Sequence, residues 1–284
     1  MGALVLIATP IGNLGDLSPR AITALQGASL ICCEDTRRTG KLLSHLGIRG
    51  VPMAISNEHT ESDRIEQVLN ILSAAGTVAV VTDAGTPGIS DPGERLVRAA
   101  IEHNHTVSAV PGPSADVMAL VISGLPTARY VFDGFIPRRG SERAQRLQQV
   151  AGELRTVVLY EAPHRLERTL VDLREVCGGE RRIVLARELT KIHEEVWRGT
   201  LETALADVRA RAPIGEYVLV LAGGSPAASA TDNDIVSALQ RALATGTSKK
   251  AAVAAVAQQL HVPKNRVYEL ALGVSSQPRG TNAN

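Results

Sequence analysis

Residues 80–93 read VVTDAGTPGISDPG, and this stretch decides the fold class. A short apolar run at 77–82, typical of a buried strand, leads into Asp83 and then into a loop with three glycines and two prolines. Glycine permits positive φ and lets a ligand approach the backbone, whereas proline fixes φ. Because open α/β sheets bind ligands beyond the carboxyl ends of their strands, the stretch predicts the wall of a ligand site. The plainer alternative is a rigid connection in which Asp83 caps a turn.

Short apolar runs and amphipathic patterns alternate on both sides of this loop. Strands are expected at 3–8, 30–33, 77–82 and 106–110, and helices at 19–26, 38–46, 63–75 and 94–102. Ser18 is the expected N-cap of the first helix, with Pro19 in its first turn. Such alternation predicts a mostly parallel sheet covered by helices.

A second α/β cycle and a helical tail follow. Strands are expected at 130–135, 156–160, 183–186 and 217–222, with helices at 141–151, 164–176 and 201–211. After a flexible linker at 223–229, helices are expected at 232–244, 249–260 and 265–272, the last two spaced like a helix-turn-helix. We therefore predict an N-terminal α/β domain at 1–124, a second α/β domain at 125–225, and a linker, helical extension and disordered tail at 226–284. A cleft between two such halves, which meet near 112–130, is a usual place for a ligand.

Composition excludes several classes of protein. The 284 residues are 44% apolar and 21% charged, with a net charge of +1, so any nucleic-acid-binding patch must be local. Aromatic residues make up 2%, which argues against base-stacking platforms. Cys32 and Cys33 are neighbours on an expected strand, point to opposite faces and are interpreted as core residues in a reducing compartment. No secretory leader and no membrane-spanning run is recognisable, so we expect a cytoplasmic protein with no membrane partner.

Common cofactor and metal motifs are missing. No GxGxxG follows the first strand, Gly40-Lys41 lacks the rest of a P-loop, and neither HExxH nor CxxC occurs. Instead, four segments rich in Gly, Pro and small residues fall at expected strand ends: TPIGN (9–13), TDAGTPG (82–88), VPGPSA (110–115) and YEAPH (160–164). Together they predict a metal-free site for a neutral or zwitterionic ligand, although each alone is compatible with a structural turn.

Seven stretches, in order, resemble the tetrapyrrole-methylase superfamily of S-adenosylmethionine-dependent methyltransferases. They are LVLIATPIGNLGDLSPRA (4–21), CEDTRRTGKLL (33–43), VVTDAGTPGISDPG, VPGPSA, FDGFIPRRG (132–140), YEAPHR (160–165) and ARELTKIHEE (186–195). CEDTRRT and DAGTPGISDPG resemble the branch that methylates ribosomal RNA; the corrin and siroheme methylases typically carry GxGPG where this chain has Ala-Thr-Pro-Ile-Gly. The resemblance implies a homodimer that 2′-O-methylates a cytidine ribose in the decoding region of 16S rRNA, in the small ribosomal subunit.

The resemblance also implies a site for folded S-adenosylmethionine between the halves. Asp83 would accept a hydrogen bond from the cofactor, and the α-helix start at Ser114 and Ala115 would hold its carboxylate. The remaining residues implied to contact it are Thr9, Pro10, Ala84, Gly85, Thr86, Pro87 and Ile89 in the first half, and Tyr160, Ala162, Ala222 and Gly223 around the adenine.

Methyl transfer to a ribose hydroxyl benefits from a general base, and the candidates are acids near strand ends. Glu34, Asp35 and Glu58 are the first choices, with His59 and Glu161 behind them; each could equally be a solvated carboxylate or helix cap. Arg37 is expected to grip a phosphate. Candidate RNA contacts are Arg37, Arg38, Arg138, Arg139, Arg143, Arg146, Lys249, Lys250, Lys264 and Arg266, for which an exposed solubilising face or a packed helical bundle is the alternative.

Two other functions stay open at this point. One is a methylase of a tetrapyrrole or other small substrate on the same fold, which would need neither the arginine-rich loop nor the basic tail. The other is a non-catalytic nucleic-acid-binding protein that works through its helix-turn-helix, which would leave the four strand-end loops unexplained.

Overall fold

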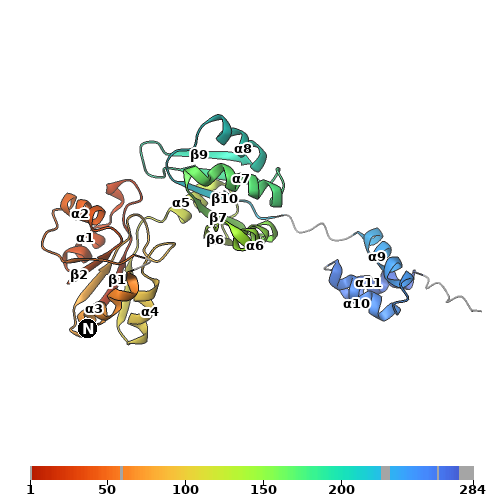
Figure 1. Ribbon diagram of the computed structural model, residues 1–284, viewed down its shortest axis with the longest axis horizontal. Helices are drawn as coiled ribbons and strands as arrows, with labels where there is room; N and C mark the ends of the chain where they lie inside the picture. Colours follow the sequence, from red (N-terminus) through yellow and green to blue (C-terminus); the bar gives the residue numbers. More distant parts are fainter. Residues whose placement is uncertain (1, 58–59, 225–230, 261, 275–284) are drawn as a thin grey trace, which may run out of the picture. The chain divides into compact units, whose positions relative to one another are not determined.

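The computed structural model describes residues 2–57, 60–224, 231–260 and 262–274, in two compact units that divide after Gly224. Figure 1 labels the elements of both units. The first unit contains two sheets, and the second is helical.

The first sheet is entirely parallel, as the sequence predicts, with the strand order β3-β2-β4-β1-β5. Its strands are β1 (Ala3–Ile7), β2 (Leu30–Cys33), β3 (Met53–Ile55), β4 (Thr77–Val80) and β5 (Thr106–Val110). The sequence pattern does not predict β3, because this three-residue edge strand carries no buried side chain. Strand β1 lies between β4 and β5 and pairs with both, so the loops that follow these three strands lie at one edge.

Helices cover both faces of this sheet. On one face lie α1 (Pro19–Gln26) and α2 (Thr36–His45), and on the other α3 (Glu61–Ser73) and α4 (Glu94–Glu102). Ser18 caps α1 as predicted, accepting from the backbone N–H of Ala21 at 3.1 Å. Cys32 and Cys33 are fully buried in the two opposite cores, which confirms their interpretation as core residues. A single 3-10 turn (Leu14–Asp16) follows β1.

The second sheet is mixed, so a parallel arrangement does not extend to it. Its strands are β6 (Tyr130–Phe135), β7 (Thr156–Glu161), β8 (Arg182–Arg187), β9 (Glu195–Thr200) and β10 (Tyr217–Leu221), in the order β6-β7-β10-β8-β9. β6 and β7 are parallel, whereas β10 runs antiparallel to both of its neighbours. Tyr217, at the start of β10, therefore lies opposite Glu161, at the end of β7.

Helices α6 (Gly140–Gly152), α7 (Pro163–Cys177) and α8 (Leu201–Ala210) cover one face of the second sheet. Helix α5 (Ala115–Ser123) covers the other, burying Ala119 and Leu120 against β7, β8 and β10. By packing, α5 thus belongs with the second half, although the predicted limit at residue 124 assigns it to the first.

The second unit comprises α9 (Asp232–Ala244), α10 (Lys249–Gln259) and α11 (Lys264–Leu272) around a small core of its own. Thr231 and Ser248 cap α9 and α10. The predicted disordered tail at 275–284 lies outside the described residues. In the part of the chain that is described, no helix combines the length and the apolar character needed to cross a bilayer.

Candidate functional site

Two loops at the carboxyl edge of the first sheet are joined main chain to main chain. The backbone N–H of Thr9 donates to the carbonyl of Gly85 at 2.9 Å, and the N–H of Gly85 donates back to the carbonyl of Thr9 at 3.1 Å. The Thr9 hydroxyl adds a buried bond to the carbonyl of Thr82. Gly85 has φ +87°, a conformation that glycine adopts without strain. The loop after β1 and the loop after β4 therefore form one rigid corner.

Further contacts join this corner to neighbouring loops. The Thr86 hydroxyl donates to the carbonyl of Pro113 at 3.2 Å, in the loop after β5. The backbone N–H of Asn13 donates to the Thr190 hydroxyl at 3.1 Å, in the loop between β8 and β9. A Cβ at Gly12 would come within 2.4 Å of the Lys191 side chain, so the close approach of the two halves here depends on a glycine.

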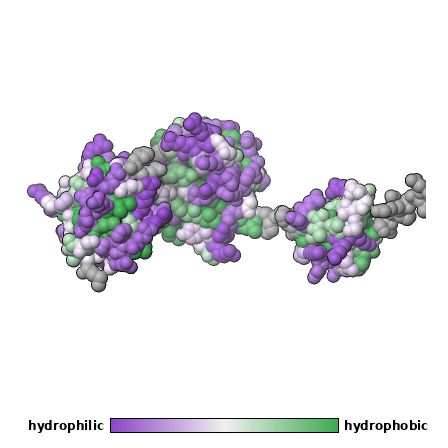
Figure 2. All heavy atoms as spheres, turned by 60° about the horizontal axis from the view of Figure 1, so that its bottom comes forward, coloured by the Kyte–Doolittle hydropathy of each residue, from purple (hydrophilic) through white to green (hydrophobic). Residues whose placement is uncertain are grey.

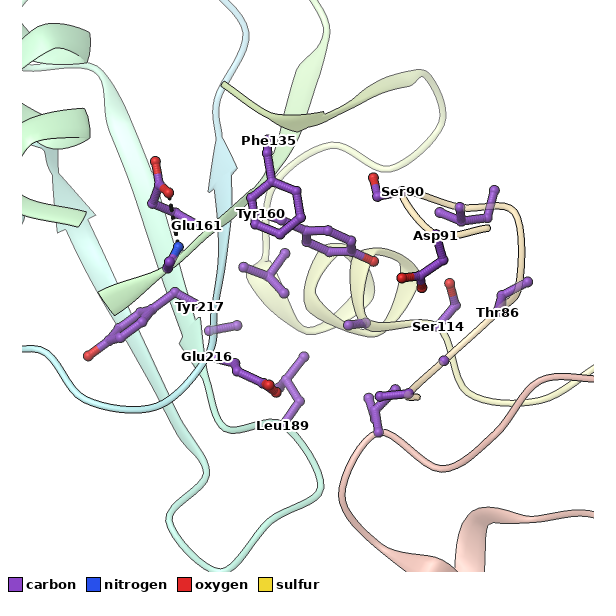
Figure 3. Close-up of a pocket in the computed structure, with 18 of the residues that line it drawn as sticks. Thr86, Ser90, Asp91, Ser114, Phe135, Tyr160, Glu161, Leu189, Glu216 and Tyr217 are labelled. Atoms are coloured by element: carbon purple, nitrogen blue, oxygen red, sulfur yellow. Dashed lines mark hydrogen bonds between the residues drawn. The ribbon is translucent and has the colours of Figure 1, made fainter. Parts of the chain in front are cut away.

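A cavity of about 370 Å³ opens beside this corner, within the size range of small-molecule sites. Figure 3 shows residues of both halves pointing into it. From the first half and α5 it is lined by Ile11, Ala84, Gly85, Thr86, Ile89, Ser90, Asp91, Ser114 and Ala115, and from the second sheet and its loops by Phe135, Tyr160, Glu161, Ala162, Pro163, Ala186, Leu189, Lys191, Glu216, Tyr217 and Val218.

Aromatic rings form one wall of the cavity. The Tyr160 ring packs edge-on against Phe135, with ring centroids 5.5 Å apart, and against Phe132 at 5.0 Å. Figure 3 shows the Phe135 and Tyr160 rings beside the cavity. Half of Phe135 is exposed, which leaves apolar surface available to a flat ligand group. On the far rim, the Lys191 ammonium donates to Glu188 at 2.8 Å and to Glu216 at 2.7 Å, so its charge is already neutralised.

The start of α5 supplies the polar side of the cavity. The Ser114 hydroxyl donates to the buried Asp116 carboxylate, and the Tyr160 hydroxyl donates to the same oxygen at 3.4 Å. Ser114 makes no side-chain cap, so the first backbone N–H groups of α5 keep their hydrogen-bonding capacity. Burial, followed by the charge of Asp116, raises the pKa of Tyr160, which therefore stays a neutral hydrogen-bond donor.

Three carboxylates gather on the first half beside the cavity. Asp91 lines it, and burial, together with the charges of Glu34 and Asp83, raises the pKa of Asp91 to about 6. Burial and Glu34 also raise the pKa of Asp83, against the pull of Arg38, whose guanidinium is 3.4 Å from the Asp83 carboxylate. The other carboxylate oxygen of Asp83 is buried and has no hydrogen-bond partner among the described residues. Among these residues, no cluster of three or more His, Cys, Asp or Glu side chains could hold a metal ion.

Most of the predicted cofactor residues meet at this cavity. Eight line it: Ala84, Gly85, Thr86, Ile89, Ser114, Ala115, Tyr160 and Ala162. Thr9, Pro10, Asp83 and Pro87 are not among its lining residues; Thr9 and Pro87 are buried behind it. Ala222 and Gly223 are wrong predictions, because β10 is antiparallel to β7 and its carboxyl end pairs with the start of β7, at the opposite edge of the sheet. A Cβ at Gly223 would lie 1.9 Å from the carbonyl oxygen of Leu154.

The predicted base candidates are placed very differently. Asp35 caps α2 and forms a 2.8 Å ion pair with Arg37, whose hydrogen bonds lower the pKa of Asp35 to about 2. Such a carboxylate is a weak proton acceptor. Glu34 accepts from the Thr82 hydroxyl at 3.3 Å. Glu161 lines the cavity, but its carboxylate is buried and bonded to Arg165, Thr169 and the backbone of Ala162. Glu58 and His59 lie outside the described residues.

Among the predicted RNA contacts, Arg143 is wrong as a surface cation. Its side chain is 5% exposed and donates to Asp172, to Thr169 and to the carbonyl of Pro137. Arg146 pairs with Asp133, and Arg266 with Asp232. The cations that remain exposed are Arg37, Arg38, Arg138, Arg139, Lys249, Lys250 and Lys264, of which Arg37 and Arg38 have carboxylate partners.

Several residues that line the cavity are not predicted from the sequence. Asp91 lies within the recognised stretch 80–93, directly before Pro92 and Gly93, yet only the fold shows that it turns into the cavity. Glu216 and Tyr217 precede a strand, and they reach the site because that strand is antiparallel. The ELTK segment around Lys191 contributes to the resemblance, but the resemblance assigns none of its positions to the site.

Comparison with known proteins first defines the class. The family described as "Tetrapyrrole (Corrin/Porphyrin) Methylases" matches residues 3–205, and the "RsmI C-terminal HTH domain" matches residues 229–274. Among solved structures, the methyltransferase CobJ is similar with a TM-score of 0.60 and 20% identity, covering 78% of this chain and 95% of that one. Diphthine synthase is similar with a TM-score of 0.59 and 14% identity, covering 78% and 90%. These likenesses show the fold.

The curated relatives define the group within that class. Proteins described as "Ribosomal RNA small subunit methyltransferase I" are 46% identical in a Synechocystis strain, over 96% of this chain and 98% of that protein. The corresponding Xylella fastidiosa protein is 41% identical over 98% and 96%, and one from Mycobacterium tuberculosis is 44% identical over 90% and 89%. The chain therefore belongs to the ribosomal RNA small subunit methyltransferase I family of the tetrapyrrole methylases.

Proposed function

We propose that the protein is an S-adenosylmethionine-dependent methyltransferase that methylates the 2′-hydroxyl of a cytidine ribose in the decoding region of 16S rRNA. The observation that carries this proposal is the extent of the similarity. The solved tetrapyrrole-type methylases cover 78% of the chain, whereas the rRNA methyltransferase relatives cover up to 98%, including the helical unit.

The cavity suits the cofactor that the proposal requires. One similar solved structure, a uroporphyrin-III C-methyltransferase with a TM-score of 0.53 and 16% identity, over 78% of this chain and 97% of that one, is described as complexed with S-adenosyl homocysteine. Here, the apolar wall at Phe135, Tyr160 and Leu189 would take the adenine, and the first N–H groups of α5 would take the carboxylate.

When bound, S-adenosylmethionine supplies a methyl group on a sulfonium, which is an activated donor. The protein's own contribution is then to position the ribose hydroxyl in line with that methyl group, to exclude water and to accept the hydroxyl proton. Arg138 and Arg139, at the start of α6, are exposed and would contact the RNA backbone, together with Arg37, Arg38 and the lysines of the helical unit.

The proposal includes a homodimer in the cytoplasm. Helix α5 exposes Val117, Met118 and Val121 by 41–58% on the face turned away from its sheet, an apolar surface that a second copy could cover. Figure 2 shows hydrophobic areas that interrupt the hydrophilic surface of the first unit. The three cysteines are free, in keeping with a reducing compartment.

The test is transfer of a radiolabelled methyl group to small ribosomal subunits and to naked 16S rRNA, both from cells that lack this modification. Nuclease digestion would then locate the label. The expected product is a single 2′-O-methylcytidine in the decoding region. Label on another nucleotide, or on a tetrapyrrole acceptor supplied in parallel, would contradict the proposal. Binding of RNA without any S-adenosylhomocysteine binding in calorimetry would indicate a non-catalytic protein instead.

A further inference from the structure

Asp91 occupies an unusual position among the acids of the site. It lies in the loop between β4 and α4 and lines the cavity. Figure 3 shows its carboxylate pointing toward the Tyr160 hydroxyl and the start of α5. Its backbone is held on both sides: the N–H of Gly88 donates to the carbonyl of Pro92 at 3.1 Å, and the N–H of Gly93 donates to the buried Glu61 carboxylate at 3.0 Å. These two hydrogen bonds hold the backbone on either side of Asp91 in place.

The other carboxylates around the cavity are already engaged. Glu161 is bonded to Arg165 and Thr169, and Glu216 is paired with Lys191. Asp116 accepts from Ser114 and Tyr160, and Asp35, outside the cavity, is bound to Arg37. Within the described part of the chain, Asp91 is the cavity-lining carboxylate without a cationic partner. A carboxylate free of such a partner keeps its capacity to take up a proton.

We infer that Asp91 is the group that accepts the proton of the substrate's ribose 2′-hydroxyl, an inference that rests on the function proposed above. In the step, the hydroxyl oxygen forms a bond to the methyl carbon while the bond from that carbon to sulfur breaks, and its electron pair stays on sulfur as a neutral thioether. The hydroxyl proton moves to an Asp91 oxygen and leaves to solvent before the next turnover. No oxidant, reductant or further reactant is needed.

The electrostatic surroundings of Asp91 agree with this role. Burial, together with the charges of Glu34 and Asp83, raises the pKa of Asp91 to about 6, although a hydrogen bond with Thr82 opposes the shift. Among the described residues, the other charged or titratable groups near Asp91 include Arg38, which pairs with Asp83, and Tyr160 and Asp116 on the opposite wall; Glu161, Lys191 and Glu216 also line the cavity. A base with this pKa is about nine-tenths ionised at pH 7 and yet basic enough to take a proton.

The test compares Asp91→Asn with Glu94→Gln, which removes an exposed acid three residues further on, outside the cavity. Single-turnover methyl transfer to the RNA should fall about 10²- to 10⁴-fold in Asp91→Asn and stay at the wild-type rate in Glu94→Gln. Calorimetry with S-adenosylhomocysteine should give the same affinity for all three proteins. Thermal unfolding checks that each variant is folded, and Asp91→Ser serves as a second variant.

Three outcomes would overturn the inference. The first is a wild-type transfer rate in Asp91→Asn or in Asp91→Ser. The second is a loss of S-adenosylhomocysteine affinity as large as the loss of transfer rate, because Asp91 would then contribute to binding and not to proton transfer. A carboxyl resonance of Asp91 titrating near pH 4 in the protein alone, followed by NMR, would also contradict it, whatever the substrate. If the wild-type protein transferred no methyl group to RNA, the proposed function itself would fail and the role of Asp91 with it.

Discussion

The buried Glu61 carboxylate, on α3, accepts a hydrogen bond from the backbone N–H of Gly93 at 3.0 Å, where α4 begins. The same oxygen accepts from the N–H of Leu96 at 3.0 Å. Gly93 has no side chain with which to cap α4, so Glu61 performs this task from a neighbouring helix, and its negative charge suits a helix N-terminus. It thereby holds the end of the loop that carries Asp91.

Replacing Glu61 should loosen this anchor. Glu61→Ala leaves two buried N–H groups without an acceptor and should lower the free energy of unfolding by about 1–3 kcal/mol. Glu61→Gln keeps an acceptor oxygen and loses only the charge, so it should cost about 1 kcal/mol or less. Urea unfolding of both variants measures the difference. Equal stability of Glu61→Ala and the wild type would show that the loop is held without Glu61.

Gly85→Ala should damage the cavity as well as the fold. At φ +87°, alanine costs about 1–2 kcal/mol, and the new Cβ would lie 3.4 Å from Ile11 on the cavity wall. Gly47→Ala is the matched control, since Gly47 has φ +69° with nothing within 4 Å of the added carbon. Both variants should lose similar stability in thermal unfolding. Only Gly85→Ala should weaken S-adenosylhomocysteine binding, by about tenfold. Equal affinities of the two variants for this ligand would show that the added Cβ at position 85 does not obstruct the cavity.

The arginines around the start of α6 should separate into two groups. Charge reversal at the exposed Arg138 and Arg139 should weaken binding to 16S rRNA and reduce its salt slope by about 0.7–0.9 for each phosphate that the variant no longer neutralises. The control is Arg49→Glu. Arg49 is exposed and precedes β3, an edge strand of the first sheet. The measurement is the affinity for 16S rRNA as a function of salt concentration. An unchanged salt dependence in the double variant would rule out this interaction with the RNA backbone.

Arg143 should behave as a structural residue instead. Its removal leaves Asp172 without its buried cation, so Arg143→Ala should destabilise the second half by about 3–5 kcal/mol. Thermal unfolding measures this loss. A well-folded Arg143→Ala variant with impaired RNA binding would instead support Arg143 as an RNA contact.

The pH dependence of methyl transfer should follow Asp91. Since the ionised carboxylate accepts the proton, the rate should rise with pH through about 6 and then level off. Glu34 is the largest charge that raises the pKa of Asp91, so Glu34→Gln should make ionisation easier and move the inflection to lower pH. Glu66→Gln, an exposed change on α3, should leave it in place. A shift to higher pH in Glu34→Gln would contradict the assignment.

Local signals in the sequence predict most of the helices and strands and the glycine-rich loops, but not the two edge strands β3 and β9 (Glu195–Thr200). Helix α4 begins and ends at the residues that periodicity predicts, and Ser18 caps α1 as its residue type suggests. The loop at Gly85 lies in the site because strand ends of a parallel sheet share an edge. These features depend on short-range geometry, which the residues themselves carry.

Features that depend on long-range pairing could not be predicted in this way. The direction of β10 decides that Tyr217, rather than Gly223, reaches the cavity, and no residue within the strand encodes that direction. The sequence places Arg143 on the surface because its partner Asp172 is 29 residues away, on the next helix. Asp91 does not stand out in the sequence because its raised pKa comes from burial and from acids on other segments.

The bridge between Thr9 and Gly85 consists of peptide groups alone. Side-chain substitutions at these positions leave both donors and both acceptors in place; among the standard residues, only proline removes one of the two N–H groups. The hydrogen bonds of this corner thus do not depend on which side chain follows Ala8, whereas position 85 is restricted to glycine by its positive φ. Substrate preference can therefore diverge on this fold without any change in the hydrogen bonds that join the two loops.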